Sequence, residues 1–123
     1  MSAILRDIFY HTDSIQKTDT GVTAQVTFDK EHPIFKGHFP DMPIVPGVCQ
    51  TQMLGEILNE ALGKDLQLSS AASIKFLSLV DPTKTPTLNL TINYAITGDG
   101  AYNVSSQYFW NETVFFKFKG AYR

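Results

Sequence analysis

Apolar and polar residues alternate along several short segments of the chain, and this pattern is typical of half-buried β-strands. The strands predicted in this way are residues 22–28, 73–80, 87–96, 102–110 and 113–122. The last two are rich in aromatic residues and are joined by Asn111-Glu112, so we expect them to form a β-hairpin. Most of the chain is therefore predicted to be antiparallel sheet.

One longer segment, residues 48–62, repeats its apolar residues with helical spacing. Apolar side chains recur at i, i+3, i+4, i+7 and i+8, namely Leu54, Ile57, Leu58, Ala61 and Leu62. Gly63 follows, as is common after a helix. A single helix must bury its apolar stripe against the sheet, and the sheet must curl to cover it. We therefore predict one α+β domain spanning residues 1–123, with one long central helix wrapped by a curved antiparallel sheet.

Composition narrows the function classes. Of the 123 residues, 43% are hydrophobic and 18% are charged, which is typical of a globular domain. A formal net charge of −2 gives no reason to expect a nucleic acid or an anionic membrane as partner. One cysteine and three histidines cannot build a disulfide framework or a Cys-rich zinc site, so we expect no metal and no cofactor. Without an apolar membrane span or a signal-peptide core, we expect a cytoplasmic protein.

The segment before the helix, residues 35–47, is restricted by its composition. Its prolines are Pro40, Pro43 and Pro46, and two glycines, Gly37 and Gly47, bracket it. Each proline fixes its own φ and pushes the preceding residue toward extended backbone, so this segment cannot be helical. It carries His38 toward the start of the helix, where backbone amides are free to bind an anion.

These residues resemble a known family. The sequence Gly37-His38-Phe39-Pro40-Asp41-Met42-Pro43-Ile44-Val45-Pro46-Gly47-Val48 resembles the histidine loop of the FabA/FabZ-type 3-hydroxyacyl-[acyl carrier protein] dehydratases, which have the hot-dog fold. Ile74-Lys75-Phe76-Leu77, continuing to Val80-Asp81-Pro82, resembles the next strand of that family. Val48-Cys49-Gln50 with Gln52 is similar to a divergent branch from polyene-pigment pathways, of the aryl polyene and flexirubin types.

The resemblance implies an active site at a dimer interface and an acyl substrate carried by acyl carrier protein or coenzyme A. It implies a homodimer or a higher homo-oligomer, and a heterodimer stays open. Dehydration needs a base at C2, donors for the thioester oxygen and an acid for the hydroxyl that leaves C3. His38 fits the base, and the amides of Gly47 and Val48 fit the donors. Phe39 and Pro46 complete the substrate-binding residues.

The acid departs from the family's pattern. The family has Asp or Glu five residues after the Pro-Gly glycine, and this chain has Gln52 there. An amide gives up no proton at neutral pH, although it can hold a hydroxyl or a water. Glu56 lies one helical turn later on the same face and could supply the acid directly or through a water held by Gln52. It could equally be a solvated or interface carboxylate.

We therefore predict a dehydratase-like enzyme that converts a 3-hydroxyacyl thioester to a trans-2-enoyl thioester in fatty-acid or polyene-type biosynthesis. Two alternatives stay open. One is an acyl-thioester hydrolase of the hot-dog fold. The other is a non-catalytic, carrier-binding subunit that completes the site of an active dehydratase.

Overall fold

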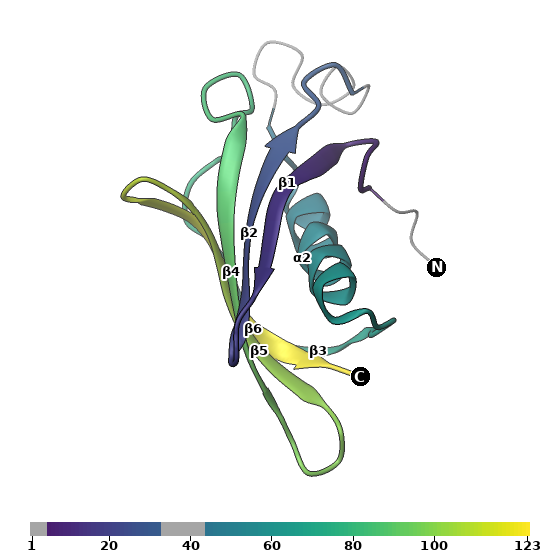
Figure 1. Cartoon of the computed structure of the whole chain (residues 1–123). Helices are drawn as coiled ribbons and strands as arrows, with labels where there is room; N and C mark the ends of the chain where they lie inside the picture. Colours follow the sequence, from purple (N-terminus) through teal and green to yellow (C-terminus); the bar gives the residue numbers. More distant parts are fainter. Residues whose placement is uncertain (1–4, 33–43) are drawn as a thin grey trace.

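The computed structural model describes residues 5–32 and 44–123, and it consists of one helix against one curved sheet (Figure 1). The helix is α2 (Gly47–Leu62). The strands are β1 (Tyr10–Lys17), β2 (Gly21–Phe28), β3 (Leu68–Phe76), β4 (Thr87–Ile96), β5 (Tyr102–Trp110) and β6 (Thr113–Tyr122). They form one antiparallel sheet in the order β1-β2-β4-β5-β6-β3, so β1 and β3 are its edges.

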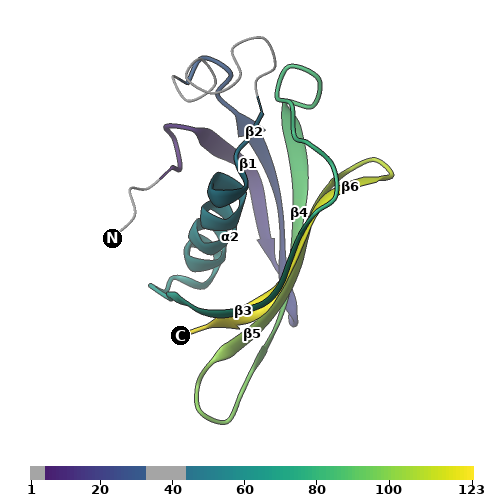
Figure 2. The same cartoon turned by 180° about the vertical axis from the view of Figure 1, so that it is seen from behind.

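The helix lies across the concave side of the sheet, as both views show (Figures 1 and 2). Its inner face buries Met53, Leu54, Ile57 and Leu58 against the inward side chains of the strands. Alternate residues of the central strands point to this core, among them Leu88, Leu90, Ile92, Val104, Tyr108, Phe116 and Phe118. Each fully buried aliphatic side chain of this kind contributes about 1.5–3 kcal/mol to folding. The predicted architecture, one helix wrapped by an antiparallel sheet, is confirmed.

The ends of the helix follow from its sequence. It begins at Gly47, one residue before the predicted start, because Pro46 at the N-cap has extended backbone with ψ of 147°. It ends where Gly63 adopts the left-handed region at φ 64°, which costs glycine little. The side chain of Asn59 then exchanges two hydrogen bonds with the backbone of Leu66, which fixes the turn away from the helix.

Four predicted strands are confirmed. The structure places β4, β5 and β6 at the predicted bounds, and β2 begins one residue earlier than expected. These strands alternate because one side of each faces the core and the other faces solvent.

One expectation about the sheet edges was wrong, and one edge strand was missed. The strand predicted at 73–80 runs instead over β3, and β1 was not predicted. Both are edge strands whose side chains are mostly exposed on both faces, so neither produces a strong apolar alternation. The apolar run after β3 leaves the ladder, because the amides of Leu77 and Ser78 both donate to the carbonyl of Phe115. No helix in the described part of the chain is long and apolar enough to cross a membrane.

Candidate functional site

The predicted site residues divide into two groups. His38 and Phe39 lie outside the described residues, so their predicted roles stay predictions. Pro46, Gly47 and Val48 form the start of α2. Gln52 and Glu56 lie farther along the same helix, one on each of the next two turns.

The start of α2 leaves two amide groups available. The amides of Cys49 and Gln50 donate to the carbonyl of Pro46, at 3.0 Å and 3.1 Å. Those of Gly47 and Val48 have no acceptor among the described residues. The N-cap makes no side-chain hydrogen bond, and the first turn contains no acidic residue. No side chain of the N-cap or the first turn therefore compensates the positive end of the helix dipole, and these two amides can bind a developing oxyanion.

An aromatic ring covers this helix start. A Cβ atom built on Gly47 would lie 2.7 Å from the ring of Phe76, so only glycine lets the ring approach so closely. Phe76 also packs on Phe116, with 5.5 Å between ring centres. Phe76 is 55% exposed and Val48 is 76% exposed, so the two amides have an open apolar rim. Phe76 belongs to the segment that resembles a strand of the dehydratase family, but no sequence pattern indicates a role for it at this site.

Gln52 and Glu56 lie together, as the helical spacing predicted. The Nε2 atom of Gln52 donates to Oε2 of Glu56 at 2.8 Å. This bond fixes which end of the Gln52 amide faces the carboxylate. The amide nitrogen points to Glu56, so the carbonyl oxygen points away from it.

Glu56 also holds the N-terminal segment against the helix. Its Oε2 accepts the amide of Leu5 at 2.8 Å, and its Oε1 accepts the amide of Arg6 and the hydroxyl of Tyr10, both at 2.9 Å. With Gln52 included, each oxygen of this carboxylate accepts two hydrogen bonds. A proton on either oxygen would have to displace one of these donors. Helical spacing predicts the position of this carboxylate, but no sequence pattern indicates its partners from the N-terminal segment.

Tyr10 was missed because the strand that carries it was not predicted. Its side chain is buried, and its hydroxyl donates to Glu56. Burial raises the pKa of Tyr10 far above its ordinary value, and the adjacent Glu56 carboxylate raises it further. Tyr10 is therefore a neutral hydrogen-bond donor throughout the physiological range.

Gln50 connects the helix to the segment that precedes it. Its Nε2 donates to the carbonyl of Val45 at 3.1 Å, and the amide of Val45 donates to the carbonyl of Val80 at 2.8 Å. The hydroxyl of Tyr108 donates to the backbone carbonyl of Gln50 at 2.8 Å. Among the residues that the structure describes, none forms a hydrogen bond with the buried Oε1 of Gln50. These contacts hold the residues just before the helix start in place.

Cys49, in the first turn of α2, lies close to the candidate site. The thiol of Cys49 is buried, and burial followed by the charge of Glu56 raises its pKa. It is therefore a small neutral core residue and not an activated nucleophile. Among the described residues, no cluster of three or more His, Cys, Asp or Glu side chains could hold a metal ion.

Comparisons with known proteins agree with this geometry. A dehydratase heterocomplex, ApeI:P from Xenorhabdus doucetiae, is 23% identical, covering 91% of this chain and 96% of that one, with a TM-score of 0.73. An uncharacterised protein from Erwinia carotovora subsp. atroseptica is also 23% identical, with coverage of 93% and 90% and a TM-score of 0.58. A conserved protein from Pseudomonas aeruginosa is 11% identical, with coverage of 99% and 93% and a TM-score of 0.63. No curated protein matches the chain.

The structural likenesses support the hot-dog fold predicted from the sequence. The family profile called ApeI-like, described as ApeI dehydratase, matches residues 14–111. That match covers most of the sheet and the whole of α2. The predicted resemblance to hot-dog dehydratases, and to their polyene-pigment branch, is therefore confirmed. This chain belongs to the ApeI-like dehydratase family.

Proposed function

We propose that this chain removes water from a 3-hydroxyacyl thioester and forms a trans-2-enoyl thioester, with the acyl group carried by acyl carrier protein or coenzyme A. The observation that carries the proposal is the uncapped start of α2, where the amides of Gly47 and Val48 have no acceptor among the described residues. Family membership supports the same type of reaction.

In this proposal the two amides bind the thioester oxygen as it gains enolate charge. Losing one such donor costs about 3 kcal/mol in other enzymes, so the pair supplies a large part of the rate enhancement. His38 removes the proton from C2, and the pair of electrons left behind is delocalised onto the oxygen held by Gly47 and Val48. Phe39 and Pro46 contact the acyl chain, and Phe76 closes the apolar rim beside them.

The hydroxyl leaves from C3 and needs a proton to depart as water. Gln52 is proposed to bind this hydroxyl, or a water beside it, through the amide end that faces away from Glu56. Glu56 supports the orientation of Gln52 and is the carboxylate nearest to it in sequence on this face of the helix. In this proposal Glu56 supplies the proton through a water held by Gln52. To carry that proton, one oxygen of Glu56 first releases one of the two donors bonded to it.

We further propose that a second hot-dog subunit pairs with β3. This edge strand and the residues after it expose apolar side chains, and an exposed apolar edge is a ready partner for another strand. The exposed residues are Leu68, Ile74, Phe76, Leu77 and Leu79, together with Val48 at the helix start. Because Val48 and Phe76 belong to both the rim and the edge, a second subunit at β3 would line the same site. The ApeI:P comparison favours a different chain as that partner, although an identical chain fits the same edge.

The proposal is tested with a 3-hydroxyacyl thioester on acyl carrier protein, following enoyl thioester formation by ultraviolet absorbance and mass spectrometry. His38→Ala should lower turnover by about 10²- to 10⁴-fold, the range for loss of a general base. His11→Ala is the matched control, because His11 is half-exposed beside Asp13 and lies outside the site. Equal turnover in the two variants would overturn the assignment of His38.

Two other outcomes discriminate the alternatives. Release of free thiol without an enoyl product would identify a thioester hydrolase. Turnover that appears only when a second dehydratase subunit is added would identify this chain as one half of a heteromeric enzyme.

A further inference from the structure

The face of the sheet that points away from α2 carries a regular set of polar side chains, which we call the outer array. Alternate residues of β3, β6, β5 and β4 pair across the strands in two adjacent rows. The first row is Lys75, Lys117, Gln107 and Thr91, and the second is Ser73, Lys119, Ser105 and Asn93. A hollow of about 480 Å³ lies over these rows.

All charged side chains of the outer array are positive. It contains three lysines and no carboxylate, although the whole chain has more acidic than basic residues. Lys75 lies directly opposite Lys117, and Lys119 follows two residues later on the same face. Strand geometry places such side chains about 5–7 Å apart at the backbone. The ion pairs formed by described residues involve none of the three. Like charges in direct opposition destabilise a sheet, and the outer array itself contains no carboxylate to offset that effect.

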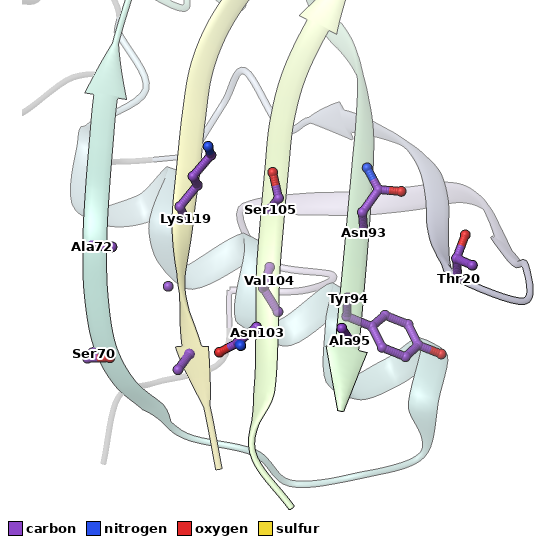
Figure 3. Close-up of a pocket in the computed structure, with 12 residues that line it drawn as sticks. Thr20, Ser70, Ala72, Asn93, Tyr94, Ala95, Asn103, Val104, Ser105 and Lys119 are labelled. Atoms are coloured by element: carbon purple, nitrogen blue, oxygen red, sulfur yellow. The ribbon is translucent and has the colours of Figure 1, made fainter. Parts of the chain in front are cut away.

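A second hollow adjoins the outer array and is lined by small side chains (Figure 3). It measures about 550 Å³ and shares Asn93, Ser105 and Lys119 with the first hollow. The hollow is an open depression, and the small residues that line it are Ser70, Ala72, Ala95, Gly120 and Ala121. Tyr94 borders this hollow, but its ring packs toward the core beside Tyr102, with 5.6 Å between ring centres. Lys119 lines both hollows. The surface thus joins an apolar half to a cationic half.

Protection of the sheet edge does not explain this pattern. Lysines on edge strands keep sheets from associating edge to edge, but β3, which carries Lys75, is the edge proposed above to pair with a second subunit. Lys117 and Lys119 lie on β6, which is paired on both sides by β5 and β3. Because β6 is not an edge strand, protection of the sheet edge does not explain these two lysines either.

We propose that the outer array and the adjoining hollow form one binding site for an amphiphilic organic anion. Its phosphate or carboxylate head binds the three lysines, with hydrogen bonds from Ser105 and Asn93. Its apolar body lies over Ala95 and Ala121. Both volumes fall in the range of small-molecule sites, about 300–1,000 Å³. A subunit that pairs at the edge of β3 extends the sheet without covering this face, so the site does not depend on the proposed reaction.

Hexyl phosphate is the probe, and titration calorimetry on the full chain is the measurement. Inorganic phosphate tests the charged head of the probe alone, and hexanol tests its apolar body alone. Heptanoate shows whether a carboxylate head can replace the phosphate head. We expect hexyl phosphate to bind at least about tenfold more tightly than inorganic phosphate, because both halves of the site are used. Equal affinities for the two would overturn the proposal, since the apolar hollow would then contribute nothing.

Three variants test the residues. The Lys117→Gln/Lys119→Gln double variant should weaken binding of hexyl phosphate about tenfold or more, whereas Lys64→Gln, an exposed lysine after the helix, should bind as the unmodified chain does. Ala95→Leu fills the hollow and should remove the advantage of hexyl phosphate over inorganic phosphate. Unchanged binding by the double variant would refute the site.

Thermal unfolding gives an independent check. Without ligand, Lys117→Gln should raise the unfolding midpoint by about 2 °C, because it relieves repulsion from Lys75. Saturating hexyl phosphate should raise the midpoint of the unmodified chain more than that of the variant. A lower midpoint for ligand-free Lys117→Gln would show that the lysine is structural and would also overturn the proposal.

Discussion

Replacing Glu56 by alanine should destabilise the protein strongly, even though the residue is only partly buried. The carboxylate accepts hydrogen bonds from four groups on two separate parts of the chain. These are the amides of Leu5 and Arg6, the hydroxyl of Tyr10 and the side-chain amide of Gln52, all at 2.8–2.9 Å. Alanine would leave all four donors without their acceptor.

The size of the effect depends on which donors can turn to water. The hydroxyl of Tyr10 cannot do so easily, because its residue is 1% exposed, and an unsatisfied buried donor costs about 1–3 kcal/mol. The other three are partly exposed and can rehydrate, so each contributes only about 0.5 kcal/mol. We therefore expect a loss of about 3 kcal/mol from the free energy of unfolding, or roughly 10 °C in the midpoint for a domain of this size.

Urea unfolding followed by circular dichroism measures this loss. Glu60→Ala is the matched control on the same face of α2: Glu60 pairs with Arg6 at 2.9 Å and is about one-third exposed, so its removal should cost less than about 1 kcal/mol. Tyr10→Phe combined with Glu56→Ala should cost about 1 kcal/mol less than the sum of the single changes, because the two groups share a bond. Equal losses for the two glutamates, or strict additivity with Tyr10→Phe, would refute this account of Glu56.

Two further predictions concern the interface of the helix with β6. Gly55→Ala should raise the free energy of unfolding by about 0.5–1 kcal/mol in urea titrations, because alanine favours the helix more than glycine does. The added Cβ would lie 3.6 Å from the ring of Tyr122, which is an ordinary contact. A lower free energy of unfolding would show that the Cβ does not fit against this ring. Burial raises the pKa of Tyr122 to about 12, whereas an unfolded tyrosine titrates near about 10. As pH rises, the unfolded chain therefore loses this proton first, and the free energy of unfolding should decrease between about pH 10 and pH 12. Tyr122→Phe should make this decrease smaller, and an equal decrease in the variant and the unmodified chain would contradict the prediction.

The fold was predictable where one face of an element is buried and the other is not. The central strands and α2 have that asymmetry, so their apolar periods of two and about 3.6 residues are visible in the sequence. The edge strands β1 and β3 lack it. The pairing of β3 with β6 contains two irregularities, between Leu68 and Ser70 and between Ala71 and Ser73, which break the alternation further. Pairing between distant segments, not local pattern, decides where such strands begin.

The candidate site was predictable where it depends on helix geometry alone. The contact of Gln52 with Glu56 follows from i, i+4 spacing. The donors from Leu5, Arg6 and Tyr10 could not be predicted, because they come from a segment about 50 residues away with no periodic signal of its own. The ring of Phe76 over Gly47 is similar, since only the folded sheet brings the end of β3 to the start of α2.

The uncapped start of α2 also offers a way to sort relatives of this chain. An acidic residue in the first turn would neutralise the helix dipole and add about 0.3–1 kcal/mol of stability. It would also place a negative charge where the proposed reaction develops one. A subunit without catalytic activity is free of that conflict. Acidic residues at positions 48 and 49 are therefore expected in non-catalytic subunits and not in catalytic ones.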